Sequence, residues 1–194
     1  RYGDNIAYVI DITTRRADNG YTIGTDITAT LTSPQGDGTA YGKWNKGKSE
    51  LSLSYEFSGY KLKGMQNEER ADYTLNDGNI YTISRNDIAT QRKQLGHDIK
   101  LTYNWMDSTA CVFQASLSGS FYRTPDNYNI KDISDGDNHY TATSRESGNN
   151  SSPVADLYFF RQLTPRQSIT ANAVGTYIST KSSNYYDEGT PYLY

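Results

Sequence analysis

The sequence predicts an all-β fold, an antiparallel up-and-down meander of about seven long strands. Three observations predict it. Apolar and polar residues alternate with a period of two along most of the chain, as they do in strands with one apolar face. The chain has 18 Tyr, which favours strands, and 16 Gly, which favours turns. Only 35% of its 194 residues are hydrophobic, which suits one face of a sheet better than a packed core.

The first three strands are expected near residues 20–32, 39–45 and 50–64. In the segment YTIGTDITATLT, which begins at Tyr21, every second residue is apolar or aromatic apart from one Thr, and SPQGDG follows as a turn. The second strand ends beside Trp44, just before the turn KGKS. In the third strand ELSLSYEF alternates strictly, and polar residues follow Gly59. We expect residues 65–78 to form a loop.

The last four strands are expected near residues 79–106, 111–123, 153–163 and 168–186. The segments DIKLTYNWM and VFQASLSGSFY alternate clearly on either side of the turn DSTA. The polar residues 124–152 are expected to form a long loop, and TPRQ forms the last tight turn.

Tight and long connections therefore alternate, so all tight turns lie at one end of the sheet. This is the layout of a transmembrane β-barrel, with short periplasmic turns and longer extracellular loops. Trp44, Trp105 and Phe113 each lie beside a tight turn on the apolar face, and we predict that they form an aromatic girdle at the membrane interface. The apolar part of each strand is roughly 9–11 residues long, enough to cross a bilayer when tilted.

Alternation also predicts which side chains face lipid and which face the barrel lumen. The expected lipid face carries Ile27, Leu31, Leu53, Phe57, Leu101, Tyr103, Leu117 and Ala171. The expected lumen face carries Asp26, Ser52, Lys100, Asn104, Ser116 and Asn172.

Charge and motifs exclude several classes of protein. The net charge is −3 and no basic stripe is present, so we expect no nucleic-acid partner. The single cysteine, Cys111, excludes an internal disulfide framework. Asp135 and Asp137, in DISDGDNHY, are weak metal candidates because the segment lacks the spacing of a calcium loop. No nucleophile elbow, Walker loop or HExxH motif occurs, so we expect no enzyme and no cofactor.

The opening stretch adds a resemblance. Arg1-Tyr2-Gly3, followed by Val9-Ile10-Asp11-Ile12-Thr13-Thr14-Arg15-Arg16, resembles the junction between plug and barrel in TonB-dependent outer-membrane transporters of the Bacteroidetes type. The resemblance implies that residues 1–19 end a plug domain and that residues 20–194 form the N-terminal part of a 22-stranded barrel. The chain is then expected to be a fragment of a longer protein.

The implied function is uptake of a scarce nutrient, such as a siderophore, vitamin or glycan, across the bacterial outer membrane. The implied partners are the lipid bilayer, the nutrient and the TonB energy-coupling complex, which would bind a region outside this chain. Tyr128, Asn129, Tyr140, Tyr185 and Tyr186 are candidate ligand contacts in the expected loops, and equally candidates for the aromatic girdle or for loop packing. The ligand-binding residues themselves stay unassigned. The alternative is a water-soluble β-sandwich or small barrel that binds glycan or protein, with the same alternation facing a packed core.

Overall fold

The computed structural model describes residues 19–107 and 110–189, and these form a single open sheet of antiparallel strands. The nine strands are β1 (Asn19–Ala29), β2 (Gln35–Lys46), β3 (Ser49–Lys63), β4 (Glu68–Thr74), β5 (Ile80–Asp107), β6 (Cys111–Asp135), β7 (Asn138–Thr164), β8 (Gln167–Thr176) and β9 (Ser179–Glu188). The predicted all-β meander is confirmed.

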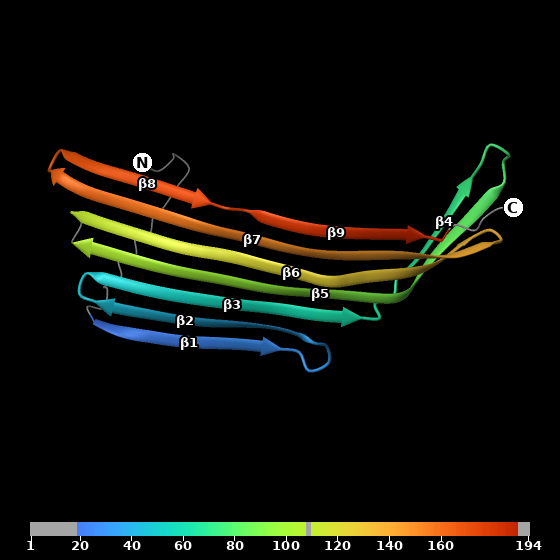
Figure 1. The fold of residues 1–194 in the computed structure, drawn as a ribbon, viewed down its shortest axis with the longest axis horizontal. Coiled ribbons are helices and arrows are strands. Elements are labelled where there is room, and N and C mark those ends of the chain that lie inside the picture. Colours follow the sequence, from blue (N-terminus) through green and yellow to red (C-terminus); the bar gives the residue numbers. More distant parts are fainter. Residues whose placement is uncertain (1–18, 108–109, 190–194) are drawn as a thin grey trace, which may run out of the picture.

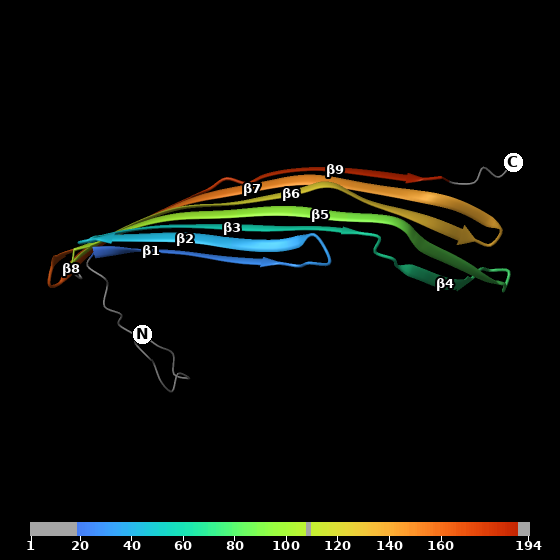
Figure 2. The same ribbon diagram turned by 90° about the horizontal axis from the view of Figure 1, so that it is seen from below.

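The strands lie side by side in the order β1-β2-β3-β5-β6-β7-β8. The remaining two strands pair near one end, β4 with β5 and β9 with β7, so that β8 and β9 follow one another along β7 (Figure 1). Seen edge-on, the sheet is one arched layer (Figure 2). The β2–β3, β5–β6 and β7–β8 connections meet at one end of the sheet, which we call the tight-turn end; the other is the long-connection end (Figure 1).

Two predicted loops are wrong. Residues 124–152 continue β6 and β7 as a long hairpin that turns at Gly136, where φ is 62°. Residues 65–78 include β4, which pairs with the start of β5. A strand with polar residues on both faces shows no alternation of apolar and polar residues, so its sequence does not predict it. Its backbone can still form the hydrogen bonds of the ladder.

Two boundaries also differ from the prediction. β1 ends at Ala29, so Leu31 lies in the bend after it rather than on a strand face. The last expected strand is interrupted at Tyr177 and Ile178, which separate β8 from β9.

Irregular pairing bends the long strands partway along their length. The register shifts between Asp87 and Ala89 and between Gln91 and Leu95 in β5, and between Thr124 and Asn127 in β6. Each shift leaves residues unpaired. An odd number of extra residues in one strand exchanges the faces on which its odd- and even-numbered side chains lie. Beyond the β6 shift, odd-numbered residues of that strand occupy the face that even-numbered residues occupied before it.

The described residues contain almost no hydrophobic core. Ile133 and Ala142 are the buried hydrophobic residues among them, whereas Ile27 is 77% exposed and Leu117 is 58% exposed. A soluble sandwich covers such a face with a second sheet, and the described residues form only one. The described part of the chain contains no helix that is long and apolar enough to span a membrane.

Candidate functional site

The register gathers the alternating residues into two chemically distinct faces. One cross-strand row runs from Ile23 through Gly42, Leu53, Leu101, Leu117 and Ala155 to Gly175. We call the face that carries this row the apolar face and the opposite one the polar face. Every expected lipid-facing residue except Leu31 falls on the apolar face, and every expected lumen-facing residue falls on the polar face.

An aromatic row borders the apolar face near the tight-turn end. Trp44 pairs with Tyr21 in the β1–β2 ladder, and Trp105 pairs with Phe113 in the β5–β6 ladder. The rings of Tyr103 and Phe113 lie 6.2 Å apart. The sequence predicts Trp44, Trp105 and Phe113 as a girdle. Trp44 lies in the cross-strand row of Tyr103, and Trp105 and Phe113 lie in the next row toward the tight turns, so the three occupy two adjacent rows.

A second aromatic row, which sequence analysis missed, borders the same face toward the long-connection end. Phe57, His97 and Phe121 are cross-strand neighbours. The His97 ring lies 5.3 Å from the ring of Phe57, and its Nδ1 is 2.7 Å from the hydroxyl of Tyr55. The residues between the two rows are mostly Leu, Ile, Ala and Gly.

The height of this apolar band can be read along β5. The strand covers the distance between the aromatic rows with about nine residues, from His97 to Trp105, which is the length of a tilted strand that crosses a bilayer. Aromatic residues at both borders of such a band are typical of outer-membrane barrels.

The polar face behind this band is a network of charged and hydroxylated side chains. Lys43 Nζ lies 2.8 Å from Glu50 Oε2, and the Asn104 amide donates to Glu50 Oε1 at 3.1 Å. Asp98 accepts hydrogen bonds from the hydroxyls of Ser120 and Tyr122. This face is suited to water rather than to lipid or to a packed core.

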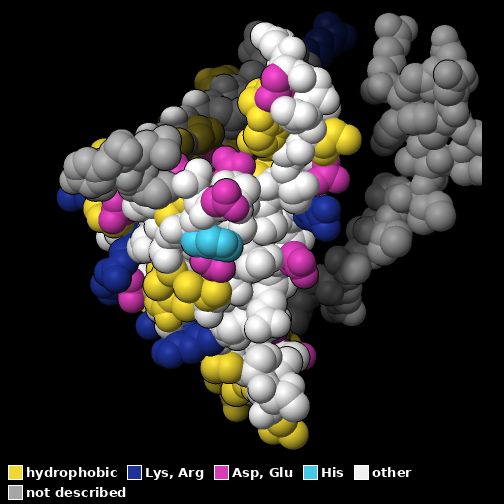
Figure 3. Space-filling model, turned by 90° about the vertical axis from the view of Figure 1, so that its right-hand side faces the viewer, with side chains coloured by type: hydrophobic (Ala, Val, Ile, Leu, Met, Phe, Trp, Pro, Cys, Tyr) yellow, Lys and Arg dark blue, Asp and Glu magenta, His cyan; other side chains and the backbone are white. Residues whose placement is uncertain are grey.

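Beyond the second aromatic row, the polar face continues as a wall of paired charges. Lys131 Nζ lies 3.5 Å from Glu69 Oε1 and 4.0 Å from Asp87 Oδ1. Arg92 Nη1 lies 3.9 Å from Glu146 Oε2. A cavity of about 380 Å³ opens among them, lined by Glu69, Arg85, Arg92, Asn129, Lys131, Ile133, Ala142, Ser144 and Tyr186. Acidic and basic side chains are interspersed when the molecule is viewed from this end (Figure 3).

The sheet divides the five candidate ligand residues between its faces. Asn129, Tyr140 and Tyr186 lie on the polar face. Tyr128 and Tyr185 lie on the other face, on either side of Arg145. Partial burial raises the pKa of the Tyr140 hydroxyl, and the carboxylate of Glu188 raises it further. The polar wall thus combines uncharged tyrosine hydroxyls with acidic and basic side chains that form ion pairs.

The weak metal candidates are not brought together with other ligands. Asp135 accepts a hydrogen bond from the hydroxyl of Tyr73 at 3.0 Å, and Asp137 lies in the β6–β7 turn. Within residues 19–107 and 110–189, no group of three or more His, Cys, Asp or Glu side chains is placed to hold a metal ion. Cys111 is a half-buried free thiol.

The expected plug–barrel junction, Arg1, Tyr2, Gly3 and Val9-Ile10-Asp11-Ile12, lies outside the described residues. No family model matches the chain, and no curated protein or solved structure matches it either. Function is therefore inferred from the two faces of the sheet and from the order of its connections.

Proposed function

We propose that this chain forms part of an outer-membrane TonB-dependent receptor that takes up a scarce nutrient, such as a siderophore, vitamin or glycan. The observation that carries the proposal is the apolar band, which crosses the sheet from β1 to β8 between two aromatic rows. In this proposal the apolar face contacts lipid, the polar face lines the lumen, and the tight turns face the periplasm.

The physical support comes from what the sheet leaves uncovered. A contiguous apolar face this large marks an interaction surface rather than ordinary protein surface. Lipid covers such a face without a second protein layer, and a barrel satisfies every backbone group within it. β1 on one side and β8 with β9 on the other are edge strands, so barrel closure requires further strands to pair with them.

The polar wall beyond the band is where the nutrient would first contact this part of the receptor. Its tyrosines and paired charges offer hydrogen bonds to a polar ligand. The TonB complex would couple energy through the plug, to which residues 1–19 would belong. The alternative, a water-soluble glycan- or protein-binding module, requires a core that the described residues do not contain.

The experiment compares charge insertion on adjacent residues of opposite faces in the native protein. Leu101→Arg and Leu117→Arg place a cation on the apolar face, at a cost of about 2–4 kcal/mol at the bilayer midplane. Thr102→Arg, on the polar face beside Leu101, is the matched control. We expect the first two variants to be lost from the outer membrane, as measured by heat-dependent electrophoretic mobility of membrane fractions.

Equal assembly of all three variants would contradict the membrane location. A second measurement tests transport itself. Uptake of the nutrient by cells should cease when the proton gradient is collapsed, while surface binding persists. If collapse of the proton gradient changed neither binding nor uptake, the TonB-dependent part of the proposal would be contradicted.

A further inference from the structure

A row of cations lies on the apolar side of the sheet, directly beyond the second aromatic row. Arg123 follows Phe121 by two residues on β6, so both side chains lie on the same face. Lys181 on β9 and Arg123 on β6 both pair with Asn149 of β7, from opposite sides. The row is therefore about 7 Å beyond the aromatic border, the distance that two strand residues span.

Arg123 and Lys181 have no anionic partner among the described residues. In the part of the chain that the structure describes, no carboxylate forms an ion pair with Arg123 or Lys181, and both side chains are exposed. Lys61 and Lys93 lie on the same face and directly oppose each other in the β3–β5 ladder. This pair lies two residues beyond Leu95, the cross-strand partner of Arg123. Like charges directly opposite each other are destabilising, so the positive charge of this face continues past the row of Arg123 and favours a bound anion.

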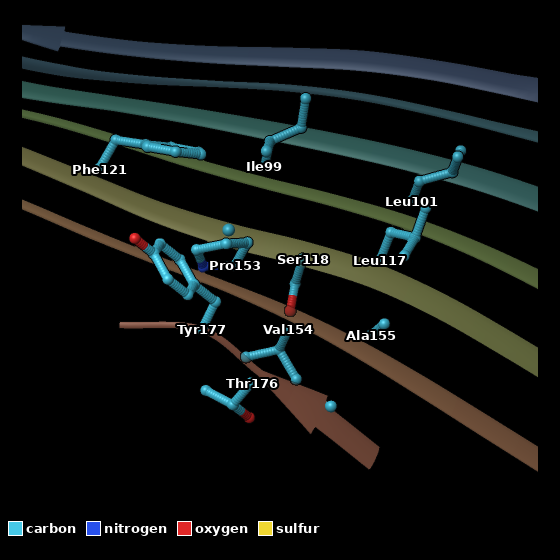
Figure 4. Close-up of a pocket in the computed structure, with 12 residues that line it drawn as sticks. Ile99, Leu101, Leu117, Ser118, Phe121, Pro153, Val154, Ala155, Thr176 and Tyr177 are labelled. Carbon is cyan, nitrogen blue, oxygen red and sulfur yellow. The ribbon is translucent and has the colours of Figure 1, made fainter. Parts of the chain in front are cut away.

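A groove in the apolar face begins just below Arg123 and Lys181. It has a volume of about 730 Å³. Its lining includes Gly119, Ala155 and Gly175, which contribute little or no side chain. The Phe121 ring lies against Gly119. The rest of the groove is lined mainly by Tyr177, Pro153, Leu117, Leu101 and Ile99 (Figure 4). Its lining is almost entirely carbon, so its occupant must be apolar at this depth.

We infer that Arg123 and Lys181 bind the phosphate group of one anionic membrane lipid, whose acyl chain lies in the groove over Ala155 and Gly175. The inference rests on the proposed membrane location. The occupant is a lipid of the leaflet at the long-connection end rather than free phosphate, because the cations and the apolar groove adjoin on one face. Arginine and lysine are the usual phosphate ligands in proteins.

The first test removes the charges from the native protein in an uncharged detergent. Phosphatidylglycerol is titrated in, and its binding is measured by native mass spectrometry. A cation near an anionic headgroup contributes about fivefold to affinity, so Arg123→Gln/Lys181→Gln should weaken binding about 30-fold. The control, Lys46→Gln/Arg161→Gln, removes the same charge from the same face at the tight-turn end and should change binding less than threefold.

The second test fills the groove without changing charge. A Cβ added at Gly175 meets no atom within 4 Å, and the same is true of Gly42, which lies on the same face outside the groove. Displacing about two buried methylene groups of the lipid corresponds to roughly a tenfold loss of affinity. We therefore expect Gly175→Leu to weaken phosphatidylglycerol binding about tenfold and Gly42→Leu to leave it unchanged.

Three results would overturn the inference. One is equal weakening by the two charge variants, which would show unspecific attraction. Another is unchanged binding in both Arg123→Gln/Lys181→Gln and Gly175→Leu. The third is displacement of the lipid by millimolar inorganic phosphate, which would show a simple anion site. If membrane assembly is normal, any of these three results overturns the lipid site alone and leaves the proposed function intact. Equal assembly of Leu101→Arg and Thr102→Arg would contradict both the lipid site and the proposed function.

Discussion

Asp72 and Asp77 in the β4–β5 hairpin are held chiefly by neutral hydrogen-bond donors. The Thr82 hydroxyl donates to Asp72 Oδ1 at 2.6 Å, and the Tyr81 hydroxyl donates to Asp77 Oδ2 at 2.7 Å. These donors lower the pKa of each carboxyl, with smaller contributions from Arg70 at Asp72 and from Asn79 at Asp77. Because the folded pKa is lowered, the charged carboxylates stabilise the hairpin above their ordinary pKa of 3.8, and this contribution is lost as the pH falls through the folded values.

The two carboxylates provide a prediction with an internal control. Thr82→Val should raise the pKa of Asp72 toward its ordinary value and leave that of Asp77 unchanged. Tyr81→Phe should do the reverse, because each variant removes the main donor of one carboxylate. Carboxyl ¹³C shifts followed by NMR during a pH titration would measure both values. A titration of Asp72 that Thr82→Val does not alter would contradict the assigned hydrogen bond.

At the scale of elements, a buried polar cluster holds the bulges of β5 and β6 in place. The Lys93 backbone N–H donates to Asn127 Oδ1 at 2.6 Å, and the Gln91 amide donates to the carbonyl oxygen of Asp126 at 2.8 Å. Asn127 is 6% exposed and Gln91 is 8% exposed. Asp126 has a φ of 71°, which few non-glycine residues adopt. The side chains thus replace ladder hydrogen bonds that the shifted register cannot form.

Asn127→Ala should destabilise the protein by about 1–3 kcal/mol, because it leaves the half-buried Lys93 N–H without its acceptor. Asn184→Ala, at an exposed position of β9, is the matched control and should change stability by less than about 0.5 kcal/mol. The midpoint of guanidinium unfolding in detergent micelles measures both. Equal midpoints for the two variants would show that the bulge does not depend on this amide.

The same bulges explain which parts of the fold the sequence could predict. The strands that cross the apolar band could be located because one of their faces is apolar, and their faces could be assigned by alternation. The β6–β7 hairpin beyond Thr124 could not, since both of its faces are largely polar. The register shifts also place Lys131 on the same face as Ser120, although one number is odd and the other even. Strict alternation along β6 would therefore assign the polar wall to the wrong face.

At the scale of the whole molecule, residues of different chemistry occupy successive levels of the sheet, from the tight-turn end to the long-connection end. The tight turns and the first aromatic row lie at one end, the apolar band follows, and the cations of Arg123 and Lys181 lie above the second aromatic row. The polar wall continues beyond them. In the proposed membrane location each level matches a different layer of a membrane, and a sheet with so few buried hydrophobic residues would be stable there as part of a barrel.

If the proposed membrane location is right, the height of the band sets the membrane thickness that the protein should prefer. About nine residues at roughly 3.3 Å each, tilted by about 40°, give a band of about 20 Å, which is thinner than an average hydrocarbon core of about 30 Å. The native protein should therefore insert more completely into vesicles of lipids with 10- or 12-carbon chains than into vesicles with 18-carbon chains. Protection of the embedded strands from added protease measures the inserted fraction. Leu101→Arg should insert poorly into every vesicle, because charge on the apolar face is unfavourable at any thickness. Insertion that increased with chain length would show that the two aromatic rows do not mark the borders of the membrane.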